Sequence, residues 1–300
     1  MKPDDFTTLI VRAEGLLARL ETLLPAPTHA TDWSAATAFR YRKRGGRAGS
    51  IEPVKHVATI RLPELKEVEP QKARLVANTR QFVERRPANN VLLTGARGTG
   101  KSSLIKACLN EFAPQGLRLI EVDKADLVDL TDIVDAIAER PERFVIFCDD
   151  LSFDEGEPGY KALKSVLDGS VAQASENVLI YATSNRRHLL PEYMRENLTY
   201  THTDDGEVHP GEVVEEKISL SDRFGLWVSF YPFDQANYLA IVDSYAKRYR
   251  ILLGREELHK EALRWAMYRG QRTGRAAEQF VIDLAGRERL AGEQGEVQAD

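Results

Sequence analysis

Hydrophobic residues follow two alternating patterns along most of the chain. Short apolar runs predict β-strands at Val91–Thr94, Leu117–Val122, Phe144–Cys148, Val178–Ala182 and Trp227–Phe230. Apolar residues three or four positions apart predict helices near Pro70–Arg86, Lys101–Phe112, Thr131–Glu139 and Tyr160–Leu167. Strands that alternate with helices indicate a parallel sheet with helices on both faces.

The two ends of the chain depart from this alternation. An amphipathic helix is predicted between Phe6 and Leu24, where Pro25 ends it. After Pro232 only helical patterns remain, at Asp234–Tyr249, Arg255–Tyr268 and Thr273–Leu290. We therefore expect three parts: an N-terminal helix and basic linker at 1–59, an α/β core at 60–232, and a helical bundle at 233–300.

The segment between the first helix and the core is basic. No acidic residue occurs between Trp33 and Ile51, and Arg40–Arg47 reads RYRKRGGR. We expect a flexible linker lying on the acidic surface of the protein itself. The alternative is contact with nucleic-acid phosphates, with Phe39 and Tyr41 stacking on bases.

Composition excludes several classes of protein. The 300 residues are 43% hydrophobic and 29% charged, as in ordinary globular proteins, and the net charge of −5 excludes a surface built to coat nucleic acid. No apolar run reaches the length of a membrane span. Both cysteines, Cys108 and Cys148, lie in apolar runs, which favours a reducing compartment. We expect a cytoplasmic protein that does not contact membranes.

A glycine-rich loop carries the strongest chemical signal. Residues 91–103 read VLLTGARGTGKSS, which is a strand, a G-x-x-x-x-G-K-S turn and the start of a helix. The glycines let the backbone curl so that its N–H groups point at phosphate oxygens, and the helix N-terminus adds its dipole. Lys101 would reach the β- and γ-phosphates of ATP, and the Ser102 hydroxyl would ligate Mg²⁺. The predicted phosphate-binding residues are Gly95, Ala96, Arg97, Gly98, Thr99, Gly100, Lys101, Ser102 and Ser103.

Two carboxylates follow the apolar run Phe144–Cys148. Asp149 is the predicted Mg²⁺ partner of Ser102, and Asp150 is the candidate that orients or deprotonates the attacking water. Asp154 and Glu155 compete with Asp150 for the second role. The alternative is that both aspartates only solvate the end of a buried strand.

Three further segments make the chain resemble AAA+ ATPases, from about residue 60 to 290. In YATSN (181–185), Asn185 resembles the sensor-1 residue; in TGRAAEQF (273–280), Arg275 resembles the sensor-2 arginine of the helical lid. SDRFG (221–225) is similar to the arginine-finger segment of replication initiators and branch-migration motors. The chain as a whole shows similarity to replication initiators and helicase loaders. The chain is also similar to a bacterial AAA+ family catalogued as a domain of unknown function.

The resemblance implies a P-loop NTPase fold: a three-layer αβα parallel sheet of AAA+ type, with an N-terminal helical extension and a C-terminal lid. It implies ATP and Mg²⁺ as ligands, with Asp150, Asn185, Arg223 and Arg275 as catalytic residues. Arg223 would enter the site of a neighbouring subunit, so a homo-oligomer is expected. Simpler roles stay open: Asn185 could cap a helix, Arg275 could be solvated, and Arg223 could pair with a nearby acid.

The resemblance favours an ATPase that remodels a protein or nucleic-acid partner. A P-loop kinase for a small molecule is an alternative. A nucleotide-gated binding module with weak hydrolysis is another, because AAA+ proteins commonly carry Asp-Glu where this chain has Asp149-Asp150.

One loop is a candidate for metal binding. His202, Asp204, Asp205, Glu207 and His209 are close together in the sequence, but their spacing fits no metal motif, so a solvated loop is favoured.

Overall fold

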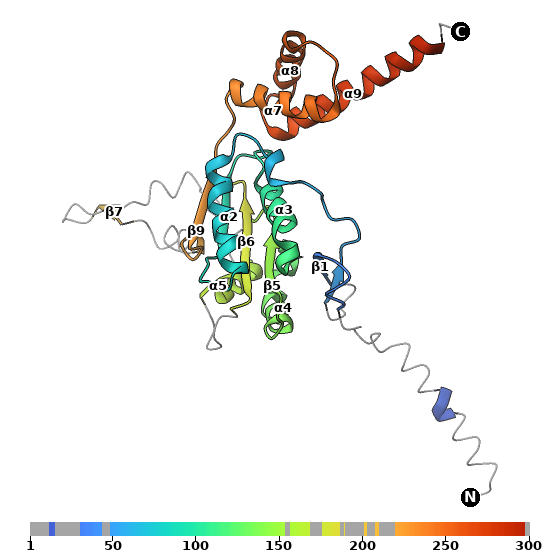
Figure 1. Cartoon of the computed structure of the whole chain (residues 1–300). Helices are drawn as coiled ribbons and strands as arrows, with labels where there is room; N and C mark the ends of the chain where they lie inside the picture. The colour runs from blue at the N-terminus through green and yellow to red at the C-terminus, as the bar shows by residue number, and fades with distance from the viewer. Residues whose placement is uncertain are drawn as a thin grey trace, which may run out of the picture.

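The computed structural model of the chain describes residues 12–15, 31–43, 49–153, 157–168, 176–186, 189, 201–202, 208–209 and 220–297. Most of these residues form a sheet flanked by helices, and a bundle of three further helices lies above it (Figure 1).

The central sheet has seven strands in the order β2-β1-β4-β5-β6-β3-β9. All neighbouring strands are parallel except β2, which is antiparallel to β1. This arrangement confirms the predicted parallel sheet. The strands are β1 Ala38–Arg42, β2 Ser50–Pro53, β3 Val91–Gly95, β4 Leu117–Glu121, β5 Arg143–Cys148, β6 Val178–Ser184 and β9 Leu226–Phe230.

Helices cover both faces of the sheet. Side chains alternate along a strand, so Val145 and Phe147 of β5 join one core cluster, and Phe144, Ile146 and Cys148 join the other. The first cluster lies under α2 (Glu69–Val83) and α3 (Lys101–Phe112); the second lies under α4 (Leu130–Ile137) and α5 (Pro158–Asp168). The fold is therefore the predicted three-layer αβα architecture. Short 3₁₀ helices η1 (Leu62–Glu64), η2 (Ala113–Gln115) and η3 (Lys124–Asp129) connect these elements.

The sheet begins earlier in the chain than predicted. β1 lies in the segment predicted to be a flexible linker, but it pairs in parallel with β4, and β2 extends it as a hairpin. Phe39 is 0% and Tyr41 6% exposed. The linker prediction is therefore wrong for residues 38–42, because the arginines there alternate with buried aromatic residues and form the more exposed positions of a strand with period two.

The basic side chains of this segment contact acids of the same chain. Arg40 forms an ion pair with Glu121, and Lys43 lies 2.9 Å from an Asp129 carboxylate oxygen. The Tyr41 hydroxyl donates to the same carboxylate over 3.0 Å. These contacts agree with one part of the expectation, that the basic segment lies against acidic residues of the same protein. Residues 44–47 of the basic run lie outside the described residues.

The C-terminal bundle, here called the lid, comprises α7 (Gln235–Tyr249), α8 (Arg255–Arg269) and α9 (Gly274–Val297). It has its own apolar core, which includes Tyr238, Ala262 and Phe280. The Asp234 side chain accepts the Asn237 N–H over 2.8 Å and so caps α7, as predicted.

Two sequence predictions concern segments with little described structure. Of the predicted helix between Phe6 and Leu24, residues 12–15 are helical and the others lie outside the described residues. Thr201–His202 (β7) and Val208–His209 (β8) pair as a short hairpin, but the acids of the candidate metal loop between them also lie outside. Among the described residues, no group of three metal-ligating side chains comes together. In the same part of the chain, no helix is both long and apolar enough to cross a bilayer.

Candidate functional site

A cavity of about 480 Å³ lies between the core and the lid. It opens at the carboxyl ends of β3, β5 and β6, where ligands bind in open parallel sheets. We call one part of it the phosphate end, formed by residues 97–103 with Asp149, Asp150, Thr183 and Asn185. We call the rest of the lining the lid end; it includes the apolar or aromatic residues Leu65, Val68, Phe233, Ile241 and Tyr245, together with polar residues such as Glu64, Lys66 and Ser244.

The glycine-rich loop after β3 has the backbone that a phosphate cradle requires. Gly98 (φ 73°) and Gly100 (φ 98°) take left-handed conformations that favour glycine. A Cβ on Gly95 would lie 1.9 Å from the Phe230 carbonyl oxygen, so only glycine fits beside β9. The loop also contacts the lid, because the Gly98 carbonyl accepts the Gly274 N–H over 2.9 Å. The N-terminus of α3 follows directly and favours an anion.

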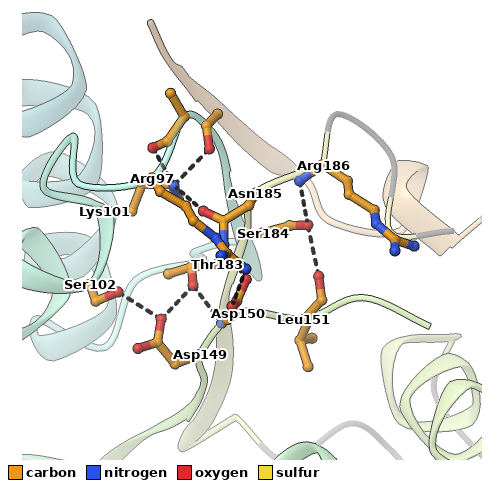
Figure 2. A network of polar contacts seen from close by, with 12 residues as sticks. Arg97, Lys101, Ser102, Asp149, Asp150, Leu151, Thr183, Ser184, Asn185 and Arg186 are labelled. Atoms are coloured by element: carbon orange, nitrogen blue, oxygen red, sulfur yellow. Dashed lines mark hydrogen bonds and ion pairs between the residues drawn. The ribbon is translucent and has the colours of Figure 1, made fainter. Parts of the chain in front are cut away.

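Lys101 lies at the centre of the phosphate end (Figure 2). Its ammonium group donates to the carbonyls of Gly95 (2.7 Å) and Ala96 (2.8 Å) and to Asn185 Oδ1 (3.0 Å). The residue is 6% exposed. Burial lowers the pKa of this ammonium group, and the nearby carboxylates of Asp150 and Asp149 oppose the shift.

Ser102 and Asp149 lie side by side, as the sequence predicted. Alternation along β5 turns Asp149 to the same face as Phe147, which is the face that α3 covers. The Ser102 hydroxyl donates to Asp149 Oδ1 over 2.6 Å. Thr183 donates to the same oxygen over 2.5 Å. A hydroxyl and a carboxylate in contact are hard oxygen ligands of the kind Mg²⁺ prefers.

Sequence reasoning did not single out Thr183. It lies two residues before Asn185, and side chains two apart on a strand share a face. The position of Asn185 opposite the phosphate loop could therefore have identified it.

Asp150 follows Asp149 but leaves the strand in a left-handed conformation, with φ 52°. Its N–H donates to Thr183 Oγ1 over 2.9 Å. Asn185 Nδ2 donates to Asp150 Oδ1, and Arg97 Nη2 lies 3.5 Å from Asp150 Oδ2. Asn185 therefore joins Lys101 to Asp150 (Figure 2). The competing acids Asp154 and Glu155 lie outside the described residues.

The two predicted arginines lie in different places. Arg275, in the first turn of α9, lines the cavity, and its charge is one cause of the lowered Lys101 pKa. Arg223 lies before β9 and outside the cavity lining, where its Nε forms an ion pair with Asp168 at the end of α5. The structure thus brings Arg275, but not Arg223, to the cavity of its own chain.

The lid end contains residues that sequence reasoning missed. Phe233, Ile241 and Tyr245 line it from the lid side, and Leu65 and Val68 from the segment before α2. The pKa of Tyr245 is raised to about 12, mainly by burial and secondarily by the Glu278 carboxylate. Residues 63–82, PELKEVEPQKARLVANTRQF, contain Leu65 and Val68 and resemble the AAA+ segment that folds over the adenine, so this stretch alone had a signal in the sequence.

Comparisons with known proteins agree with this architecture. No curated protein matches the sequence. Among solved structures, a point mutant of Thermotoga maritima RuvB superposes with a TM-score of 0.52 at 14% identity, over 75% of this chain and 64% of RuvB. Another point mutant of the same protein gives 0.50 at 17% identity, over 74% and 64%. The chain thus spans less than two thirds of RuvB, and the likeness shows a shared AAA+ fold.

A family model covers most of the chain. It matches residues 34–288, which include β1, the whole described sheet and the lid up to α9. The chain has the AAA+ fold and belongs to the family described as "Protein of unknown function (DUF815)".

Proposed function

We propose that this chain binds Mg-ATP in the cavity between core and lid and hydrolyses it to drive conformational change in a protein or nucleic-acid partner. One observation carries the proposal: Lys101, Ser102, Asp149 and Asn185 converge on the glycine-rich loop at one end of that cavity. The fold alone does not imply activity, so the proposal depends on this site.

The residues at the phosphate end fit a nucleotide triphosphate. Backbone N–H groups of residues 95–101 and the α3 N-terminus would bind phosphate oxygens, and Lys101 would exchange its bonds to the loop carbonyls for bonds to phosphate. Ser102 and Asp149 would hold magnesium, which supplies charge neutralisation at the β- and γ-oxygens when bound. Base and ribose would occupy the lid end, where Ile241 and Tyr245 offer apolar surface.

Hydrolysis needs an oriented water and stabilisation of charge on the γ-phosphate. Asp150 would accept the proton of that water, and Asn185 would hold both the water and the carboxylate in place. Arg275 would add positive charge from the lid.

We further propose a homo-oligomer in which Arg223 acts in the site of a neighbouring subunit. Arg223 lies outside its own cavity, which supports a role in another subunit. Its ion pair with Asp168 would then be exchanged for contacts at the interface. Because arginine fingers contribute on the order of 10³–10⁵ in rate, turnover per subunit should rise with protein concentration. Arg223→Ala should lose turnover while it still binds ATP.

A nucleotide-gated binding module with weak hydrolysis is the second candidate. Both Asp150 oxygens already have a partner, Asn185 or Arg97, and the side chain is one methylene shorter than glutamate. A carboxylate held in this way could be a poor base.

One pair of measurements tests both candidates. Calorimetry with Mg-ATP measures binding, and phosphate release without added acceptor measures hydrolysis over a range of protein concentrations. Binding with release supports the ATPase, and binding without release at every protein concentration contradicts it and agrees with the gated module. If the folded wild-type chain binds no Mg-ATP, both candidates are excluded.

A further inference from the structure

Arg97 is a charged side chain in the middle of the phosphate-binding loop, between Ala96 and Gly98. The loop needs backbone N–H groups and Lys101 to bind phosphates, and an arginine at this position is not part of the G-x-x-x-x-G-K-S pattern. The Arg97 side chain is 75% exposed, and its Nη2 lies 3.5 Å from Asp150 Oδ2. Figure 2 shows the side chain extending from the loop across to the acidic pair.

The Asp150 carboxylate is held from two separate segments. Asn185, just after β6, donates to Oδ1, and Arg97, from the loop after β3, contacts Oδ2. The backbone of Asp150 contributes as well, because its left-handed φ of 52° turns the side chain out of the strand direction. A left-handed conformation is strained for a non-glycine residue, and the bond from Asp150 N–H to Thr183 Oγ1 helps to hold it.

We propose that Arg97 is a positioning residue for Asp150, in that it fixes the orientation of the carboxylate that handles the attacking water. This inference rests on the proposed ATPase function. A single donor leaves a carboxylate free to rotate about its Cβ–Cγ bond, whereas donors on both oxygens fix its plane. Arg97 contacts the carboxylate through one nitrogen, Nη2, so the role requires a single cationic donor at Oδ2.

The same loop also contacts the lid, which links the position of Arg97 to that of α9. The Gly98 carbonyl accepts the Gly274 N–H over 2.9 Å, next to Arg275. A Cβ on Gly98 would meet the Thr273 side chain at 2.9 Å, so the two segments pack closely here. A shift of the lid would therefore move the loop and change how Arg97 holds Asp150.

The test compares Arg97→Gln and Arg97→Lys with the wild-type chain. Because the Arg97–Asp150 pair is exposed, its contribution is modest, and Arg97→Gln should lower kcat about 3- to 10-fold. The Kd for Mg-ATP from calorimetry should stay within about twofold, and Arg97→Lys should recover most of kcat. Arg86→Gln is the matched control, because Arg86 is also exposed (70%) and lies 3.4 Å from Glu84, just after α2 and outside the cavity lining.

A double-mutant cycle separates action through Asp150 from direct action on phosphates. If Arg97 acts through Asp150, Arg97→Gln should have little further effect on single-turnover hydrolysis in an Asp150→Asn background. Where single-turnover hydrolysis in the Asp150→Asn background is too slow to measure, Asp150→Glu replaces it. The factor by which Arg97→Gln lowers the hydrolysis rate should then again differ from the factor measured in the wild-type chain.

Three results would overturn the inference while leaving the ATPase intact: an unchanged kcat in Arg97→Gln, a loss confined to Mg-ATP affinity, or the same fold effect with and without Asp150. A wild-type chain that releases no phosphate would instead contradict the proposed function itself.

Discussion

The two ends of the cavity are built in opposite ways. At the phosphate end, polar side chains contact one another over short distances. The ammonium group of Lys101, for example, has three hydrogen-bond partners. At the lid end, the segment before α2 and helix α7 both line the cavity, where apolar Leu65, Val68 and Ile241 lie among polar residues such as Lys66 and Ser244. The first end suits a charged group of fixed geometry, and the second suits a flat ring that carries polar groups.

The comparison suggests how binding energy is divided. Directed, charge-assisted bonds are each worth more than ordinary hydrogen bonds, whereas apolar contacts scale with the area removed from water. The phosphate end should therefore decide whether a ligand binds, and the lid end should decide which base is preferred. This division can be tested by substituting residues at each end and measuring the affinity of each variant for ATP and for inorganic triphosphate.

The largest effect is expected for Lys101→Ala. It removes the ammonium group at the centre of the phosphate end, so affinity for Mg-ATP and for triphosphate should both fall at least about 100-fold, as expected for lost hydrogen bonds to charged groups. Isothermal calorimetry measures both ligands, and a thermal melt verifies that the variant is folded. Wild-type affinity in a folded Lys101→Ala chain would contradict the site.

An intermediate effect is expected for Tyr245→Ala at the lid end. Loss of the partly buried ring should weaken Mg-ATP binding about 10-fold, as for loss of a large apolar contact, while triphosphate affinity stays within about twofold. Tyr268→Ala is the matched control, because Tyr268 is also on the lid but is 90% exposed and does not line the cavity. Equal losses for both ligands in Tyr245→Ala would mean that the two ends are not separate.

The smallest effect is expected for Arg248→Ala. Arg248 of α7 lies 3.4 Å from Glu64 and joins lid to core, but both side chains are partly exposed, at 47% and 33%. Exposed pairs contribute about 0–1 kcal/mol, so the Kd for Mg-ATP should change no more than about 5-fold. A loss as large as that of Lys101→Ala would show that lid attachment, and not the phosphate end, controls binding.

Much of the core could be predicted because its signals are local. β3, the glycine-rich loop and α3 are contiguous in the chain. The G-x-x-x-x-G-K-S pattern therefore defines the positions of Gly100, Lys101 and Ser102 relative to one another. Apolar runs also identified β4, β5 and β6, because residues on both faces of these strands belong to the two core clusters, and β9, whose Val228 and Phe230 are buried on one face. β1 was missed because most of its residues are charged or aromatic, and only pairing with β4 makes it a strand of this sheet.

The sequence by itself determined the alternating αβ core, the helical lid and the glycine-rich loop, since each depends on neighbours within a few residues. Only the tertiary structure decided which side chains meet across long separations: Asn185 with Lys101, Arg97 with Asp150, Arg223 with Asp168, and Tyr245 with the cavity. The physical reason is that these contacts depend on strand order and on how the lid packs over the sheet. Neither property is a function of local spacing.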